Sequence, residues 1–510
     1  AGEGGGMNGA DWLLALPIAV PLFACAAGAA LHGRHAAQRL VTLVSAAALL
    51  LVSLLLLARV RAEGVLASQM GDWPAPFGIT LVADLLGAAM VVIGAVMYLA
   101  VAVYALADGA EERERQGWHP LLGGLMLGVS GSFLAGDIFN LYVWFEVMLI
   151  SSFGMLVIGQ AREQLDAAVK YAVLNLGATT VFLIAVGMLY GATGTLNMAD
   201  LAQKIPQNEN PGLIAALAFL FLCSFGAKAA VFPLFFWLPA AYHTAAAPVA
   251  AIFAGMLTKV GVYVMIRVFT LVFAPETTPF IGPTVGMIAA ATMVTGVLGA
   301  AAHWDIRRIL SFHIISQIGY MLVGVALGTP LALAGAVLYV VHHIVVKANL
   351  FLVAGAINRA GGSFQLAHLG GLWKRDPWLG ILFAIPALSL AGLPPLSGFW
   401  GKLVVAQSGF EAGAAWLAAV ALAVGLLTLY SMLKIWTEAF WKPAPPDAPA
   451  AAGLDGATRW LMLGPVAALA LVTLAIGLWT EPFAALALAA GEQLAGREAY
   501  IAAVLGSAAR

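Results

Sequence analysis

Long runs of apolar residues constrain this chain more than any other feature of its sequence. Runs of about 20 apolar residues, the length of a helix that crosses a hydrocarbon core roughly 30 Å thick, alternate with clusters of charge, glycine or proline. Helices of soluble proteins have a polar stripe, and most of these runs have none. Only 10% of the residues are charged and 62% are hydrophobic, which leaves too little polar surface to face water all round. The sequence therefore predicts an all-α integral membrane protein.

Apolar length and breaks at charge, glycine or proline clusters predict about fourteen transmembrane helices. Their expected ranges are 11–31, 39–58, 79–106, 119–136, 138–159, 167–191, 212–237, 246–272, 280–302, 307–328, 331–358, 379–407, 413–440 and 459–480. After the last span, residues 482–508 are alanine-rich and amphipathic. We expect this segment to lie at the membrane interface or to dock on a neighbouring subunit.

The Lys and Arg residues of the loops predict the orientation of the chain. Odd-numbered loops hold twelve of them: Arg34, Arg39, Arg113, Arg115, Arg162, Arg307, Arg308, Arg359, Lys374, Arg375, Lys442 and Arg459. Even-numbered loops hold four: Arg59, Arg61, Lys204 and Arg267. Because positive charge marks the cytoplasmic side, we expect the odd loops in the cytoplasm and both termini outside.

Prolines interrupt two of the predicted spans, each beside a lysine. Pro233 and Pro239 lie near Lys228 in span seven, and Pro394 and Pro395 lie near Lys402 in span twelve. Proline removes a helix donor and clashes with the preceding turn, so we expect broken helices 7 and 12. Breaks five spans apart predict that spans 4–8 repeat as spans 9–13 in inverted orientation, as in transporters. Two ordinary proline kinks are the alternative.

These breaks and repeats predict five segments along the chain. Residues 1–10 form an N-terminal tail, for which an expression remnant is one interpretation, and residues 11–118 hold the first three helices. The two five-helix repeats occupy 119–272 and 273–440, and residues 441–510 hold the last helix and the amphipathic segment.

Ionisable side chains inside the apolar spans point to function. They are Glu146, Lys228, Lys259, His313 with nearby Gln317, His342, His343, Lys347 and Lys402. Each such group costs about 2.5–3.5 kcal/mol at bilayer depth on insertion scales and marks a pathway by default. A dry site and a nearby carboxylate shift the proton affinity of a lysine in opposite directions, so Glu146 and Lys228 would form a switch. His343 and Lys347 are four residues apart, on one helix face. Joined by water, such groups would relay protons along the bilayer midplane.

Each charge also has a structural interpretation. Glu146 and Lys228 could form a structural ion pair, and His342, which points away from its neighbour His343, could be a packed polar residue. Asp137 could cap a helix, and His243 could be solvated in a loop. Taken together, the residues fit a purely structural role less well. Structural ion pairs need equal numbers of positive and negative groups, and the interior holds four lysines with one clear glutamate.

Other chemistries find no support in the sequence. The net charge of -1 provides no basic field for nucleic acid. No phosphate-binding glycine loop or cysteine cluster is present, and Cys25 and Cys223 lie in apolar runs, as packing residues do. We therefore predict a transporter subunit with no cofactor and no covalent chemistry, and the sequence leaves a metal site undetermined.

Five segments carry a family resemblance across roughly residues 120–410. They are WFEVMLISSFGML, FGAKAAVFPLFFWLPAAYHTAAAPVAAIFAGMLTKVGVY, RRILSFHIISQIGYM, VVHHIVVKANLFLVAGAI and LPPLSGFWGKL. As a set they resemble the proton-translocating antiporter-like family shared by respiratory complex I and the Mrp cation/proton antiporters. The earlier segment GDWPAPFGITLVADLLGAAM is similar to the Mrp-type members of this family, and to their D-type subunits in particular.

The resemblance implies a role for each matching residue. Glu146 and Lys228 match the family's acid–lysine pair, and Lys259 matches the basic residue of span eight. His343 and Lys347 match the central relay, and Lys402 matches the terminal ionisable residue. Gln317 replaces a histidine of some relatives, and nearby His313 is a candidate substitute. The remaining supporting residues are Asp137, His243, His342, Pro233, Pro239, Pro248, Pro394 and Pro395.

The resemblance further implies a multisubunit antiporter in the bacterial inner membrane, exchanging H+ for Na+ or a related cation beside other membrane subunits. A proton-pumping subunit of complex I or of a membrane-bound hydrogenase is the alternative. A third interpretation is a structural scaffold whose charges only hold a complex together.

Overall fold

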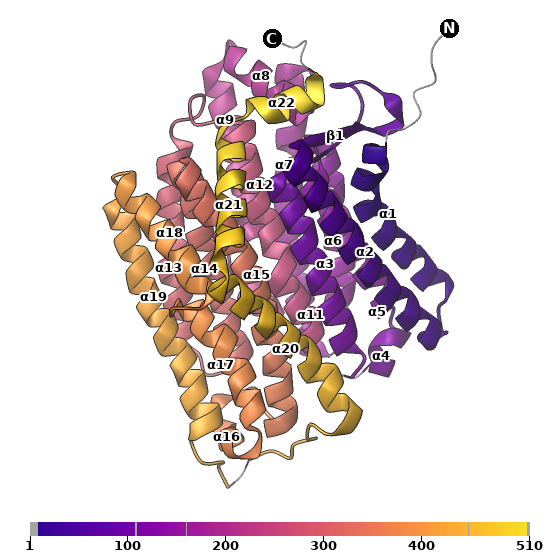
Figure 1. Cartoon of the computed structure of the whole chain (residues 1–510), viewed down its shortest axis with the longest axis vertical. Helices are drawn as coiled ribbons and strands as arrows, with labels where there is room; N and C mark the ends of the chain where they lie inside the picture. Colours follow the sequence, from indigo (N-terminus) through magenta and orange to yellow (C-terminus); the bar gives the residue numbers. More distant parts are fainter. Residues whose placement is uncertain (1–8, 108–109, 160, 447, 507–510) are drawn as a thin grey trace.

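The computed structural model describes residues 9–107, 110–159, 161–446 and 448–506, which form a bundle of long helices (Figure 1). Within these ranges, twelve helices are long and apolar enough to cross a membrane. Helix α5 has 17 residues and α17 and α18 have 15 each, below the length of that set. The predicted membrane architecture is confirmed, while the count of about fourteen spans and the inverted repeats stay predictions.

The helices follow one another along the chain with short connections. The first half contains α1 (Gly9–Ala30), α2 (His35–Glu63), α3 (Leu85–Ala105), α4 (Ala110–Arg115), α5 (Trp118–Leu134), α6 (Ile138–Val157), α7 (Arg162–Thr193), α8 (Met198–Lys204), α9 (Pro211–Ala229), α10 (Trp237–Tyr242), α11 (Ala247–Ile252) and α12 (Thr258–Leu271). The second half contains α13 (Ile281–Ala302), α14 (Ile306–Leu327), α15 (Pro330–Gly361), α16 (Leu372–Arg375), α17 (Pro377–Ala391), α18 (Ser397–Glu411), α19 (Ala415–Trp436), α20 (Gly456–Leu478), α21 (Thr480–Ala495) and α22 (Glu498–Leu505).

Short polar side chains cap many helix starts. Asp84, Asp137, Asn210, Asp305 and Thr329 each accept a backbone hydrogen bond at the first turn of α3, α6, α9, α14 and α15. Such a cap satisfies a donor that has no partner within the helix and none in lipid. Asp137 thus has the capping role that the sequence left open.

The first predicted helix break is present between α9 and α10. Helix α9 ends at Ala229, and Ala230 turns the chain out of the helix with φ 61. The freed backbone finds partners inside the protein: Phe232 donates its N–H to Thr292 Oγ1 at 2.9 Å, and the indole of Trp237 donates to the Ala227 carbonyl at 2.9 Å. Protein groups therefore satisfy unwound backbone at this depth, as the bilayer requires.

The second break separates α17 from α18. Gly392 ends α17 with φ 93, a conformation that favours glycine, and Pro394 and Pro395 fill the gap before α18. Gly398 donates its N–H to Ser389 Oγ at 3.2 Å across the break. The break thus leaves the last carbonyls of α17 free for other donors.

A small β-hairpin departs from the all-α prediction. Strands β1 (Leu66–Gln69) and β2 (Thr80–Ala83) pair antiparallel, with Leu66 opposite Ala83. The hairpin lies between α2 and α3, at the end of the bundle where α8 and α22 lie (Figure 1). Outside the spans, water can satisfy the strand edges, so a sheet is tolerated there.

The C-terminal segment packs on its own chain. Helix α21 continues from α20 and runs beside α15 (Figure 1). The contact is so close that a Cβ on Gly491 would lie 2.4 Å from the Pro330 carbonyl oxygen. Gln493 accepts a hydrogen bond of 2.9 Å from the backbone of Leu85. Helix α21 therefore packs on α15 of its own chain through small residues such as Gly491, and its expected position at the membrane interface or on a neighbouring subunit stays a prediction.

Arg267 is not a loop residue. It lies in α12 with 4% of its surface exposed, and its guanidinium forms an ion pair with the Asp84 carboxylate. Tyr263 and Tyr500 place their rings 5.7 and 5.1 Å from the guanidinium. The expectation that Arg267 is an even-loop residue is therefore wrong, because its guanidinium is buried beside Asp84 within α12, while the orientation of the chain stays a prediction.

Removing the Asp84 carboxylate is expected to destabilise the fold by about 3–5 kcal/mol, because it leaves a buried guanidinium without a counter-charge. Thermal unfolding of the purified complex carrying Asp84→Ala measures this loss. Glu481→Ala, which changes an exposed acid of α21, is the control and should leave the unfolding temperature unchanged. An Asp84→Ala variant as stable as the parent protein would contradict the role of this pair.

Glu114 joins α4 to α2 and α5. Its carboxylate accepts two hydrogen bonds from Arg39, at 2.7 and 2.9 Å, and lies 3.3 Å from His119 Nε2. Burial disfavours the charged carboxylate, but the hydrogen bonds from Arg39 and His119 outweigh burial and lower the pKa of Glu114. An acid with a lowered pKa stabilises the fold above its ordinary pKa, and this stabilisation disappears as the pH falls through the lowered value.

Glu114→Gln is therefore expected to reduce stability near neutral pH by about 1–2 kcal/mol, towards the low end for charged hydrogen bonds because Arg39 is partly open to water. The difference from the parent should shrink as the pH falls below 4.5, the ordinary value. Unfolding measured across pH tests this expectation. Glu63→Gln is the control: it breaks an exposed ion pair with Arg59 on α2, the helix that also holds Arg39, and should have little effect at any pH. An equal loss in both variants would refute it.

Candidate functional site

Glu146 and Lys228 lie close together in the first half of the chain. Lys228, in the last turn of α9, is 5% exposed, and its Nζ lies 5.6 Å from the centre of the Phe145 ring. Glu146 is the carboxylate that acts electrostatically on Lys228. The described side chains do not pair directly within 4.0 Å, and Oε1 of Glu146 is buried without a hydrogen-bond partner. The two residues are therefore neighbours without a direct ion pair.

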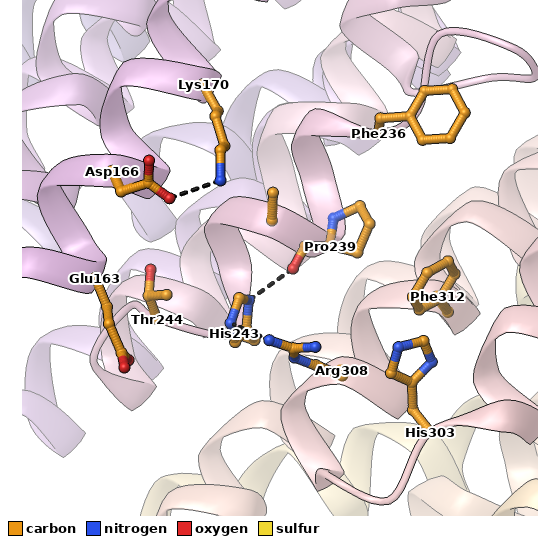
Figure 2. Close-up of a pocket in the computed structure, with 11 residues that line it drawn as sticks. Glu163, Asp166, Lys170, Phe236, Pro239, His243, Thr244, His303, Arg308 and Phe312 are labelled. Carbon is orange, nitrogen blue, oxygen red and sulfur yellow. Dashed lines mark hydrogen bonds and ion pairs between the residues drawn. The ribbon is translucent and has the colours of Figure 1, made fainter.

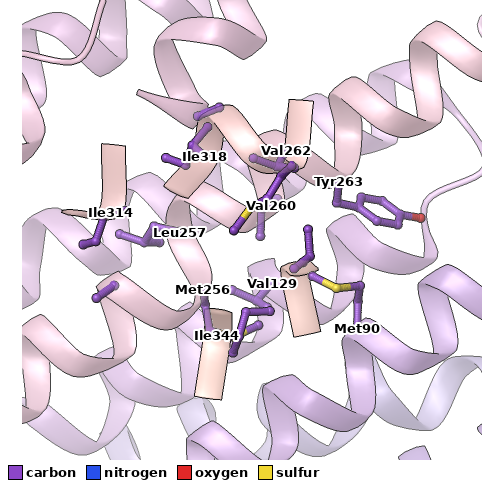
Figure 3. Packing of buried hydrophobic residues seen from close by; sticks show 14 of the residues in the cluster. Met90, Val129, Met256, Leu257, Val260, Val262, Tyr263, Ile314, Ile318 and Ile344 are labelled. Carbon is purple, nitrogen blue, oxygen red and sulfur yellow. The ribbon is translucent and has the colours of Figure 1, made fainter. Parts of the chain in front are cut away.

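Lys259 lies fully buried at the start of α12. In the hydrophobic core around this part of the chain, Met256 and Val260 pack with Ile344 of α15 (Figure 3). Its ammonium donates to the Ala254 carbonyl and, at 3.2 Å, to Thr258 Oγ1. Ala254 belongs to a π-helical turn, Phe253–Leu257, between α11 and α12. A π-turn loosens the regular hydrogen-bond ladder, and here one of its carbonyls holds a buried cation.

The middle of the molecule contains the predicted central pair. His343 and Lys347, on α15, are both 0% exposed, and Lys347 donates to the Leu310 carbonyl at 3.0 Å. Lys259 acts electrostatically on both of them. The structure therefore brings the lysine of α12 and the central relay residues into one electrostatic group.

His313 extends this group towards the second break. It lies on α14, fully buried, within electrostatic reach of Lys347 and Lys402. Both ring nitrogens of His313 and both of His343 are buried without hydrogen-bond partners in the described structure. Buried polar atoms normally have a partner, and functional sites are a frequent reason for exceptions.

Gln317 makes a different set of contacts from His313. It accepts a hydrogen bond from the Tyr339 hydroxyl, and its amide nitrogen lies 3.5 Å from Thr428 Oγ1 and 3.3 Å from Ser316 Oγ. Its side chain is thus tied to α15 and α19. An amide does not titrate, so of these two residues only His313 can carry a proton.

Lys402 lies just beyond the second break, on α18. Its ammonium donates to the carbonyls of Leu390 and Ala391, each at 3.0 Å, and lies 4.9 Å from the centre of the Tyr320 ring. These carbonyls end α17, where the helix dipole favours a positive charge. Lys402 also lines an otherwise largely apolar cavity of about 290 Å³.

The supporting residues lie in the helix breaks, contact them, or lie in loops and helix starts nearby. His342 joins α15 to the second break, with Nδ1 2.8 Å from Ser397 Oγ, as expected of a packed polar residue. His243 is half-buried: Nδ1 lies 2.7 Å from the Pro239 carbonyl and Nε2 lies 3.2 Å from the Arg308 guanidinium. Pro233, Pro394 and Pro395 lie in the breaks, Pro239 lies within α10, and Pro248 lies in the first turn of α11.

Sequence reasoning missed the burial of three further charges within the predicted spans, those of Lys434, Asp84 and Arg267. Lys434, on α19, is 9% exposed and donates to the carbonyls of Ala301 and His303 at 2.8 and 2.7 Å. It acts electrostatically on His313. Asp84 pairs with Arg267, as described above. Lys434, Asp84 and Arg267 all fall inside predicted spans, so a stricter count of charges within the spans would have found them.

A metal site has no support in the described part of the chain, where no group of three or more His, Cys, Asp or Glu side chains comes together. The buried series is instead rich in ammonium groups, which repel cations. Lysine and histidine are side chains that can gain and lose a proton.

The chain matches a known family over most of its central part. The family described as NADH:quinone oxidoreductase/Mrp antiporter matches residues 135–428. This range includes Glu146, Lys228, Lys259, the central pair and Lys402.

Relatives match over nearly the full length. The D-type subunit of the Na(+)/H(+) antiporter of Alkalihalophilus pseudofirmus is 42% identical over 97% of this chain and 99% of the relative. The corresponding protein of Bacillus subtilis is 40% identical over 96% and 98%. Among solved structures, the Mrp complex from Dietzia sp. DQ12-45-1b contains a chain with a TM-score of 0.90 and 33% identity, covering 97% of this chain and all of that one. A chain of an archaeal membrane-bound sulfane sulfur reductase has a TM-score of 0.87 at 25% identity, covering 97% and 99%.

The family match covers the part of the chain that holds the buried charges, and the relatives match nearly its whole length. This chain belongs to the NADH:quinone oxidoreductase/Mrp antiporter family, among the D-type subunits of its Mrp antiporters.

Proposed function

We propose that this chain is the proton-translocating subunit of a multisubunit Mrp-type cation/proton antiporter in the bacterial inner membrane. One observation carries the proposal: buried lysines and histidines of both halves lie in one electrostatic group, from Lys259 through His343 and Lys347 to His313 and Lys402. The exchanged cation is Na+, by similarity to relatives whose names specify Na(+)/H(+) exchange.

A proton enters the first half and passes the Glu146–Lys228 switch and Lys259. It crosses the centre at His343 and Lys347, aided by His313, and leaves near Lys402. Coupling is electrostatic, because like charges at short range in a dry interior repel strongly, so a proton at one site disfavours a proton at the next. Internal water joins the sites, since the unpartnered ring nitrogens of His313 and His343 are polar enough to bind it.

The partners of this chain are other membrane subunits, and its odd loops face the cytoplasm with both termini outside. Identity of 42% over nearly full length with the D-type subunit of an Na(+)/H(+) antiporter favours this function over the complex I-like pump considered above. The chain works by moving ions, and we assign it no bond-making chemistry and no cofactor.

Glu146→Ala, Lys228→Ala and Lys402→Ala are each expected to slow transport at least about tenfold, which corresponds to a barrier raised by about 1.4 kcal/mol. The assay is cation-dependent proton movement in vesicles that contain the assembled complex. Lys374→Ala is the matched control, because this lysine is exposed in α16, outside the proposed path. Full activity in all three variants would refute the relay. Failure of all three to assemble would favour the scaffold interpretation.

The adjacent histidines should behave differently from one another. His343→Gln is expected to cut transport and leave assembly intact, because His343 makes no hydrogen bond in the described structure that assembly would lose. His342→Ala should instead reduce stability by about 1–3 kcal/mol, because it removes the contact with Ser397 across the second break. Size-exclusion profiles, thermal unfolding and vesicle transport separate the two effects. The opposite pattern would contradict the assignment of His343 to the relay.

A further inference from the structure

A cavity of about 470 Å³ lies away from the buried series, between α7, α10 and α14 (Figure 2). Charged side chains of both signs and two aromatic rings are among the residues that line it: Glu163, Asp166, Lys170, Arg308, Phe236 and Phe312. The transport path proposed above does not use these six residues. We therefore consider a separate ligand for this cavity.

The charges of this cavity balance. Glu163 and Asp166, near the start of α7, contribute two negative charges, and Lys170 and Arg308 contribute two positive charges. Lys170 pairs with Asp166 at 2.6 Å, and Arg308 lies 3.2 Å from the imidazole of His243. Glu163 has no ion pair within 4.0 Å among the described residues, which leaves its carboxylate open to a ligand. A ligand that matches this lining has one positive and one negative group.

Apart from the Asp166–Lys170 pair, whose charges cancel and which lies further along α7, the lining changes from charged to apolar with depth. Glu163 and Arg308 lie in the first turns of α7 and α14, at the end of the bundle where the odd loops lie. Phe312 lies one turn further along α14, and Phe236 precedes α10 on the side of the helix break. Phe236 is 65% exposed, so its ring is open to an acyl chain at this cavity. Charged groups at the helix ends suit a polar headgroup, and aromatic rings further in suit an acyl chain.

We propose that this cavity binds a zwitterionic phospholipid that has a primary ammonium in its headgroup, as phosphatidylethanolamine does. Arg308 binds the phosphate, Glu163 accepts hydrogen bonds from the ammonium, and an acyl chain lies against Phe236 and Phe312. Arginine suits phosphate because its planar donors match two oxygens at once. A quaternary ammonium has no N–H to donate to Glu163, and an anionic headgroup would bind Arg308 but leave Glu163 without a positive partner.

Lipid binding to the intact, lipid-stripped complex tests the proposal. Native mass spectrometry would compare phosphatidylethanolamine, phosphatidylcholine and phosphatidylglycerol with identical acyl chains. We expect the ethanolamine lipid to bind at least about fivefold more tightly than the other two. Arg308→Gln and Glu163→Gln should each weaken its binding about five- to tenfold, the range that corresponds to roughly 1–1.4 kcal/mol.

Each matched control removes a charge of the same sign at the same end of the helix bundle but outside the cavity. Arg34→Gln, in the loop before α2, and Glu112→Gln, in α4, should leave ethanolamine-lipid binding unchanged. Equal or tighter binding of the glycerol lipid would overturn the proposal in favour of an anionic-lipid site. Unchanged binding in both cavity variants would overturn it as well. Because binding is the readout, this test is independent of the relay.

Discussion

The hydrogen bonding of buried ammonium groups by backbone carbonyls is the interaction on which the rest of this structure depends. Lys259 uses a carbonyl of the π-turn, Lys347 a carbonyl of α14, and Lys402 the carbonyls that end α17. Lys434 uses the carbonyls that end α13 in the same way. Carbonyls stabilise a charged lysine without fixing its charge, as a carboxylate partner would. Each site can therefore lose its proton without leaving a buried counter-ion.

This interaction explains why the helices are irregular where they are. A regular helix consumes its own carbonyls, whereas a break, a π-turn or a helix end leaves some of them free. Lys259 and Lys402 each lie at such an irregularity, and Lys228 lies in the last turn of α9, at the negative end of the helix dipole. The breaks thus have a chemical role besides a topological one.

The structure also separates two kinds of buried charge. Asp84 and Arg267 form a paired, neutral unit that the two tyrosine rings enclose, and this pair holds α3, α12 and α22 together. The lysines of the proposed relay have only Glu146 as a nearby carboxylate in the described structure. Paired charges stabilise an arrangement, whereas unpaired charges respond to one another, so the two sets suit different tasks.

The sequence reveals the buried charges and helix breaks of this fold better than it reveals their partners. Lysines and prolines inside apolar runs are visible in a sequence, so the breaks near Lys228 and Lys402 and the positions of the buried charges are predictable. The carbonyl partners are not, because every residue has a carbonyl and only the fold decides which are free. Arg267 resembles a loop residue because it lies near a span end, and the partner of α21 is hidden because α15 is far away in sequence.

Water between the buried groups is the most direct test of a continuous proton path. A density map of the assembled antiporter at a resolution that shows ordered water would examine the ring nitrogens of His313 and His343. The relay predicts water molecules within hydrogen-bond distance of these nitrogens, linking Lys259 and Lys347 to Lys402. A dry interior, in which apolar side chains separate these residues, would contradict it.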